Sequence, residues 1–245
     1  MRSTKSRNLF YIHWQKILIF ALLCSFCGSI NAQRAKGNYN FLDFQQKPYY
    51  FGITLAYNNS DFRLFRSDDF ILNDSIGAVQ DVNGPGFNLG IVTNLKIGSY
   101  FDFRFLPTLS FVERNIRYQK TEFAQIETSK IEQVLVEMPF HLRYKSAPYH
   151  DMRLFVIAGV KYSFDVASNS RTRQADELVK ISPTDFAIEY GAGIQFFFPY
   201  FIFSPEFKIS NGVSNSLIFD ADLVKSTVLE KVLSRTFTIS LHFEG

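Results

Sequence analysis

Cysteine is almost absent from the 245 residues, since only Cys24 and Cys27 occur. Both lie in a leader-like stretch in which basic residues precede eleven mostly apolar residues, 17–27, and small residues follow up to Ala32. This arrangement predicts a secretory signal peptide over 1–32, cleaved after Ala32. The mature chain would then contain no cysteine, which excludes both a disulfide framework and a thiolate metal site.

Long hydrophobic runs are also missing beyond the leader, where no stretch reaches the ~18 apolar residues of a membrane-spanning helix. An excess of basic residues is missing too. Of the 26 Lys and Arg, four lie in 1–32, which holds none of the 23 Asp and Glu, so 22 basic residues face 23 acidic ones and the net charge becomes −1. A helical membrane protein and a nucleic-acid partner are therefore not expected.

Residues for metal, cofactor or covalent chemistry are few. The mature histidines, His141, His150 and His242, are scattered over the chain, so no metal site is predicted. Gly191 and Gly193 form an isolated GxG without a following helix, which favours small residues that make room for neighbours over nucleotide binding. We expect no catalytic residue, no cofactor and no small-molecule substrate.

Aromatic residues, by contrast, make up 17% of the chain, and they alternate with polar ones. In the stretch 193–210, GIQFFFPYFIFSPEFKIS, Phe203 and its alternate neighbours share one face, while Glu206 and Lys208 lie on the other. A period of two predicts a β-hairpin. In a soluble sandwich the aromatic face would meet a core, whereas in an outer-membrane barrel it would meet lipid.

Alternation of this kind recurs in eight segments. They are 50–59, 86–97, 100–119, 131–144, 152–164, 185–198, 201–210 and 235–243. Long polar connections (60–85, 120–130, 165–184 and 211–234) alternate with short ones (98–99, 145–151 and 199–200). This pattern is typical of an all-β, eight-stranded antiparallel up-and-down outer-membrane β-barrel with long extracellular loops and short periplasmic turns.

The predicted organisation is a signal peptide over 1–32, a periplasmic lead-in over 33–49 and a transmembrane barrel over 50–245, located in the outer membrane. The interior of an eight-stranded barrel is just wide enough for side chains to fill it. We expect the inward-facing charges to pair there, because buried charges persist only when paired, and we expect no open pore. This lumen network comprises Arg104, Glu137, Arg143, Arg153, Lys161, Glu189, Glu206 and Lys208.

Several segments permit more than one interpretation. Ser240 and His242 share an inward face, which favours lumen filling over a lipid-modifying hydrolase. The stretch 220–234 has nearly helical spacing and could cap the barrel mouth or serve as a docking surface. The stretch 33–48 could be a contact arm or a disordered lead-in. Three prolines within the strands, all assigned to the outward face, suggest bulges: Pro107, Pro139 and Pro205.

Most of the mature chain, from Lys47 to about Leu217, resembles the PorT family. The resemblance lies in the segments KPYYFGITLAYNNSDFRL, VEMPFHLRYKS, VIAGVKYSFDVAS and FFPYFIFSPEFKISNG. PorT proteins are outer-membrane barrel components of the type IX secretion system. The resemblance implies a non-enzymatic protein needed for export and maturation of cargo with C-terminal sorting domains.

The implied partners are other type IX secretion components and outer-membrane lipids. Because an eight-stranded barrel is too narrow for folded cargo, an accessory or assembly role is more plausible than that of a conduit. The alternatives are a small porin-like barrel with a role in adhesion or envelope stability, and a lipid-modifying barrel enzyme.

Overall fold

The chain divides into two compact units, 1–36 and 37–245. The computed structural model describes residues 38–67, 76–120, 126–166, 181–218 and 228–245, all within the second unit. The predicted signal peptide, 1–32, lies outside the described residues.

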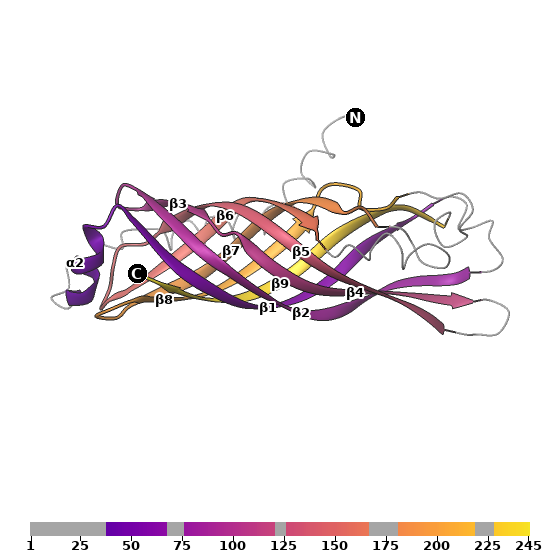
Figure 1. Ribbon diagram of the computed structural model, residues 1–245, viewed down its shortest axis with the longest axis horizontal. Coiled ribbons are helices and arrows are strands. Elements are labelled where there is room, and N and C mark those ends of the chain that lie inside the picture. Colours follow the sequence, from indigo (N-terminus) through magenta and orange to yellow (C-terminus); the bar gives the residue numbers. More distant parts are fainter. Residues whose placement is uncertain (1–37, 68–75, 121–125, 167–180, 219–227) are drawn as a thin grey trace, which may run out of the picture. The chain divides into compact units, whose positions relative to one another are not determined.

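The described residues form one short helix and a closed antiparallel sheet (Figure 1). The elements are α2 (Tyr39–Gln45), β1 (Tyr49–Arg66), β2 (Ile76–Ile97), β3 (Phe101–Phe105), β4 (Thr108–Lys120), β5 (Ile126–Lys145), β6 (Met152–Asp165), β7 (Thr184–Phe197), β8 (Ile202–Gly212) and β9 (Leu229–Glu244). Neighbouring strands along the chain pair with each other, except that β3 and β4 each pair with β2 and β5, and β1 pairs with both β2 and β9. The sheet therefore closes on itself, and the predicted up-and-down barrel is confirmed.

One predicted strand, 100–119, is divided into β3 and β4. The break falls at Leu106 and Pro107, because proline has no N–H to donate to the ladder. Both pieces pair with β2 on one side and β5 on the other, so together they occupy one strand position. The barrel therefore has eight strand positions. The assignment of Pro139 to the outward face is wrong, since it is buried on the inner face of β5. The registers show no shift at Pro139 or Pro205, so no bulge forms at either residue.

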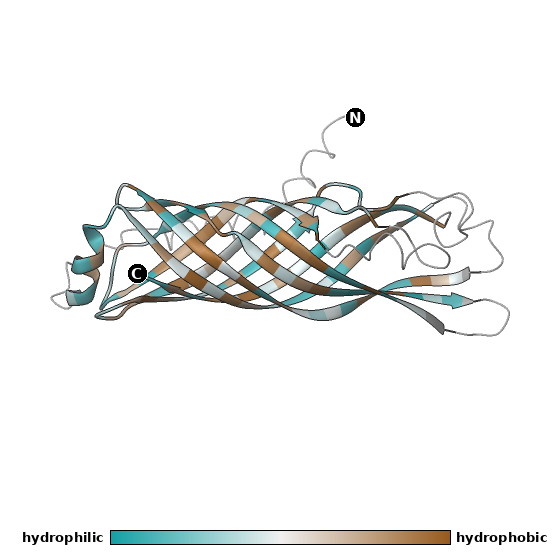
Figure 2. Cartoon of the chain, in the orientation of Figure 1, coloured by the Kyte–Doolittle hydropathy of each residue, from teal (hydrophilic) through white to brown (hydrophobic). Residues whose placement is uncertain are grey.

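The outer surface of the barrel carries a hydrophobic belt. Hydrophobic and polar residues alternate along the strands (Figure 2), and the outward-facing members are large exposed side chains such as Phe51, Ile91 and Leu241. Exposed tyrosines mark the two borders of this belt: Tyr49, Tyr100 and Tyr144 at one, and Tyr57, Tyr162 and Tyr190 at the other. Aromatic girdles at both interfaces are the arrangement that a lipid bilayer favours for a transmembrane barrel.

The strands also extend well beyond this belt, into segments that the sequence assigns to loops. β2 begins at Ile76 rather than 86, β5 at Ile126 rather than 131, and β9 at Leu229 rather than 235. β2, β4 and β5 project at the end of the barrel away from α2 (Figure 1). Beyond the membrane the outer face of a strand meets water instead of lipid, so the apolar outward face that reveals a strand within the membrane is lost there.

The three short turns, 98–100, 146–151 and 198–201, join β2–β3, β5–β6 and β7–β8. They lie with α2 at what we call the short-turn end; the opposite end is the long-loop end.

The helical interpretation of 220–234 is wrong for its described part, because residues 229–234 belong to β9. Among the described residues, no helix has the length and apolar character needed to cross a bilayer.

Candidate functional site

The interior of the barrel is the candidate site, and the structure places all eight residues of the predicted lumen network there. Each faces inward and is at most 7% exposed. Seven of the eight lie in ion pairs with other interior side chains. The contacts form two clusters, one toward the short-turn end and one nearer the long-loop end.

Arg104 on β3 is central to the cluster toward the short-turn end. Its Nη1 donates to Glu206 Oε2 at 2.7 Å, and its Nη2 donates to Glu244 Oε1 at 2.9 Å. All three side chains are inaccessible to solvent. One guanidinium group thus holds β3, β8 and β9 together across the barrel, with two charge-assisted hydrogen bonds.

Arg143 on β5 extends this cluster. Its Nη2 donates to Asp102 Oδ2 at 2.6 Å and to Asn94 Oδ1 at 2.8 Å, and it also contacts the Tyr50 hydroxyl. Lys145 Nζ donates to the second carboxylate oxygen of Asp102. Asp102 therefore accepts from two cations, which compensates the cost of removing its charge from water.

Glu189 on β7 joins the second cluster. His141 Nε2 lies 2.6 Å from Glu189 Oε2, while the Nζ atoms of Lys161 and Lys208 lie 3.5 and 3.4 Å from its carboxylate. Lys161 also donates to Glu137 at 2.9 Å. Side chains from β5, β6, β7 and β8 are thereby connected through alternating positive and negative groups.

Arg153 is placed differently from the other predicted residues. It donates to the backbone carbonyls of Ser146 and Ser99, each at 2.8 Å, and its guanidinium lies over the Phe41 ring with 5.1 Å to the centroid. Its contacts thus join two short turns to α2. Within the described residues it stabilises the short-turn end rather than pairing with a carboxylate.

Sequence reasoning missed several members of the network. Asp102 and His141 have inward parity in their predicted strands, and this parity alone could have identified them. Glu244 lies two residues beyond His242, just past the predicted end of the last strand, so extending the alternation by one residue would have included it. Lys145 likewise continues the inward face of β5 beyond its predicted end.

The short-turn end is closed by α2, which packs against the barrel. Phe41 and Phe44 lie in a buried hydrophobic cluster with Tyr50, Phe197 and Ile202. The rings of Phe41 and Phe197 meet edge to face with 5.1 Å between their centroids. The interpretation of 33–48 as a disordered lead-in is therefore wrong for those of its residues that the structure describes.

Hydrogen bonds fix the helix to the β5–β6 turn. Asp151 Oδ1 accepts from the Phe41 backbone N–H at 3.0 Å, and the Asp151 backbone N–H donates to Asn38 Oδ1 at 3.0 Å. Asp151 and the preceding His150 both have left-handed backbone conformations, with φ of 55° and 46°. Such conformations are uncommon for residues other than glycine, and here the contacts with α2 help to hold them.

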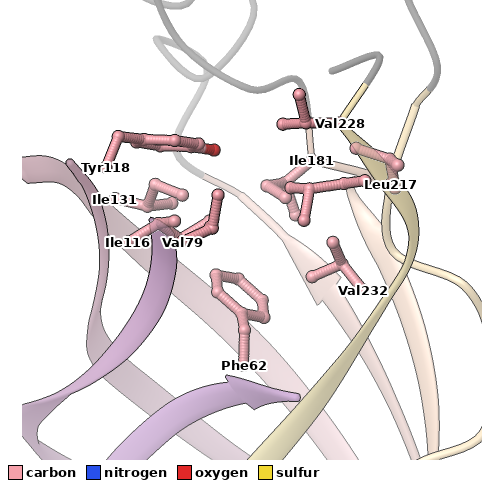
Figure 3. Packing of buried hydrophobic residues seen from close by; sticks show 10 residues of the cluster. Phe62, Val79, Ile116, Tyr118, Ile131, Ile181, Leu217, Val228 and Val232 are labelled. Atoms are coloured by element: carbon pink, nitrogen blue, oxygen red, sulfur yellow. The ribbon is translucent and has the colours of Figure 1, made fainter. Parts of the chain in front are cut away.

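The long-loop end is closed by a second hydrophobic cluster (Figure 3). Residues of the extended strands contribute Phe62, Val79, Ile116, Tyr118, Ile131, Leu229 and Val232, and the flanking segments contribute Ile181, Leu217 and Val228. Ile181 and Leu217 also form a β-bridge. The charged interior thus lies between two hydrophobic clusters, one at each end.

Groups for metal or covalent chemistry do not gather in the described part of the chain. No set of three or more His, Asp or Glu side chains there could hold a metal ion. His242 Nε2 lies 3.6 Å from Glu206 Oε2, with Ser240 two residues away on the same inner face. Gly193 leaves room for an aromatic ring, since a Cβ at this position would lie 2.4 Å from the Phe155 Cζ atom.

A closed antiparallel barrel with a hydrophobic belt, aromatic borders and an ion-paired interior defines an outer-membrane β-barrel protein. The chain belongs to the outer membrane protein beta-barrel domain family, whose model matches residues 31–217. Its location is the outer membrane. No curated protein shows significant similarity to the chain.

Several solved outer-membrane barrels are similar in structure. OprG from Pseudomonas aeruginosa is 10% identical with a TM-score of 0.46, and the match covers 80% of this chain and 95% of OprG. Neisserial surface protein A is 10% identical with a TM-score of 0.42, covering 80% and 96%. Ail of Yersinia pestis is 14% identical with a TM-score of 0.34, covering 81% and 100%. At these identities the likeness concerns the fold alone.

The closed barrel predicts heat-modifiable migration on a detergent gel. Without boiling, the closed sheet has no free edge from which SDS can readily unravel it, so the folded protein should migrate faster than the boiled one. Gel electrophoresis of isolated membranes, with and without boiling, measures this directly. Identical migration of the two samples, with recovery of the protein in the soluble periplasmic fraction, would contradict the barrel.

Proposed function

We propose that the protein is a non-enzymatic outer-membrane component of the type IX secretion system, needed for export and maturation of cargo with C-terminal sorting domains. The observation that carries this proposal is the filled interior, in which buried ion pairs lie between two hydrophobic clusters. A barrel of this kind is suited to an accessory or assembly role rather than to conducting cargo.

The proposed system follows from the resemblance to PorT. The resembling segments map onto β1, the second half of β5, β6 and the β7–β8 hairpin, so they lie in strands that form the barrel wall. The proposed partners are other components of this secretion system, together with the lipids that surround the hydrophobic belt. We place no catalytic residue in the barrel, and neither a nucleic acid nor a small-molecule substrate is part of the proposed role.

Deletion of the gene tests the proposal. The deletion strain should accumulate unprocessed sorting-domain cargo inside the cell, and the wild-type gene supplied in trans should restore secretion. Unchanged secretion would reject the proposal. An altered lipid A structure would instead support a lipid-modifying enzyme, whereas lost adhesion or envelope integrity with normal secretion would support the porin-like alternative. Crosslinking followed by affinity purification would then identify the direct partner.

A further inference from the structure

Three buried polar side chains on neighbouring strands have atoms without a hydrogen-bond partner among the described residues. These atoms are Gln195 Nε2 on β7, Ser204 Oγ on β8 and both ring nitrogens of His242 on β9, of which Nε2 lies 3.6 Å from Glu206 Oε2, beyond hydrogen-bond distance. The three residues, which we call the unpaired row, face the interior and are at most 1% exposed. Leaving such groups unpaired away from water costs about 1–3 kcal/mol each, so a partner is expected.

The strand register places the unpaired row on one level of the barrel. Ser204 lies directly opposite His242 in the β8–β9 pair. On the other side of β8, Gly193 pairs with Glu206 and Phe196 with Phe203, so the same register puts Gln195 level with Ser204. Because neighbouring strands lie about 4.8 Å apart, the three side chains stand next to one another on the inner face.

Two carboxylates border the unpaired row. Glu206 lies two residues along β8 from Ser204, and Glu244 lies two residues along β9 from His242, both on the same inner face. Each uses one oxygen for Arg104. The other oxygens, Glu206 Oε1 and Glu244 Oε2, are buried without a hydrogen-bond partner in the described structure. Unused acceptors therefore lie on β8 and β9, on the same inner face as the unused amide donor of Gln195 on β7.

A gap in the backbone ladder coincides with the unpaired row. Between the pairs Gly193–Glu206 and Phe196–Phe203, the described β7 and β8 strands show no pairing at Ile194 and Gln195. Pro205, which faces Ile194 in this register, has no N–H to donate. The interruption is a feature of the backbone and is therefore independent of the unpaired side chains.

We propose that the unpaired row, together with Glu206 and Glu244, is a binding site for ordered water molecules. The ligand has to accept from the Gln195 amide and also donate to carboxylate oxygens. An anion could not donate to the carboxylates and would be repelled by them, and a metal cation could not accept from the amide. Water does both, and a buried water typically makes about three hydrogen bonds to otherwise unsatisfied groups.

Bound water at this position would connect side chains of β7, β8 and β9 at the level where the β7–β8 ladder is interrupted. The site concerns the architecture of the barrel and does not depend on the proposed secretion role. It also assigns a role to His242 other than metal binding or nucleophilic chemistry, namely that of a hydrogen-bonding partner for water.

NMR of the isotope-labelled full chain in detergent micelles tests the site. We expect magnetisation transfer from water to the Gln195 side-chain amide protons. The matched control is Gln133, also buried and inward-facing, because its Nε2 donates to Asp165 at 3.3 Å and its Oε1 accepts from Arg114 at 2.8 Å. A water signal at Gln195 no stronger than that at Gln133 would overturn the proposal.

Two serine variants test whether Ser204 shares the bound water with Gln195. Ser204→Ala removes one partner of the bound water and should weaken the water signal at Gln195. Ser60→Ala should leave this signal unchanged, because the Ser60 hydroxyl bonds directly to Thr236 Oγ1 at 3.0 Å. Both changes remove a single oxygen, so both variants should fold. A signal at Gln195 that Ser204→Ala does not alter would exclude a shared water site.

Discussion

Replacement of Arg104 by methionine is expected to cause the largest loss of stability of any single change in the barrel. The substitution keeps much of the side-chain volume but leaves Glu206 and Glu244 without the guanidinium that bonds them at 2.7 and 2.9 Å. Removing one partner from a buried ion pair costs about 3–5 kcal/mol, and here two carboxylates lose the same partner. Urea unfolding in detergent, followed by circular dichroism, measures the change in the free energy of unfolding.

Two further variants act as comparisons for Arg104→Met. Glu206→Ala should destabilise the barrel less, because Arg104 retains its bond to Glu244. Phe203→Leu should change little, since Phe203 lies on the outer belt and exchanges one apolar contact with lipid for another. A Phe203 variant more damaging than either charge variant would mean that the assignment of inner and outer faces is reversed.

Truncation of Phe41 to alanine is expected to release α2 from the short-turn end. The change removes the edge-to-face contact with Phe197 and the cation–π contact with Arg153. Phe→Ala at a buried site costs about 3–5 kcal/mol, which the docked helix loses locally while the barrel wall stays intact. Hydrogen exchange of the α2 backbone amides in detergent should then accelerate by about a hundredfold or more, since about 1.4 kcal/mol corresponds to a factor of ten.

Tyr39→Ala is the matched control, because Tyr39 belongs to the same helix but is 76% exposed. It should leave the exchange of α2 close to that of the wild type. Equal acceleration in both variants would mean that intrinsic helix stability, rather than docking against the barrel, protects these amides. Unchanged exchange in Phe41→Ala would exclude the proposed closure by this contact.

The barrel wall within the membrane could be read from the sequence, because lipid on one side and a filled lumen on the other impose strict alternation. Phe203 and Glu206 illustrate this, since their spacing assigns them to opposite faces. The same parity selected the eight charged residues that the structure places inside. The number of strand positions and the order of short and long connections follow from the same pattern.

The limits of the strands were less predictable. Outside the bilayer the outer face of a strand meets water instead of lipid, so the apolar outward face no longer marks the strand, as where β9 pairs Leu233 with Arg63 of β1 beyond the belt. Alternation likewise cannot show that Pro107 divides a strand, that Pro205 lies at a gap in the pairing of β8 with β7, and that Pro139 lies in continuous pairing of β5 with β6. The outcome depends on whether a neighbouring strand requires the missing N–H at that point.

The sequence by itself determined which residues face lipid and which face the interior, because parity along a single strand is a local property. Only the tertiary structure decided which charges meet, since Arg104, Glu206 and Glu244 come from three strands whose register is set by the closure of the whole sheet. Tertiary structure likewise brought Phe41 and Phe44 to the short-turn end. A seven-residue helix is unstable alone, and it forms here because burial against Phe197 and Ile202 stabilises it.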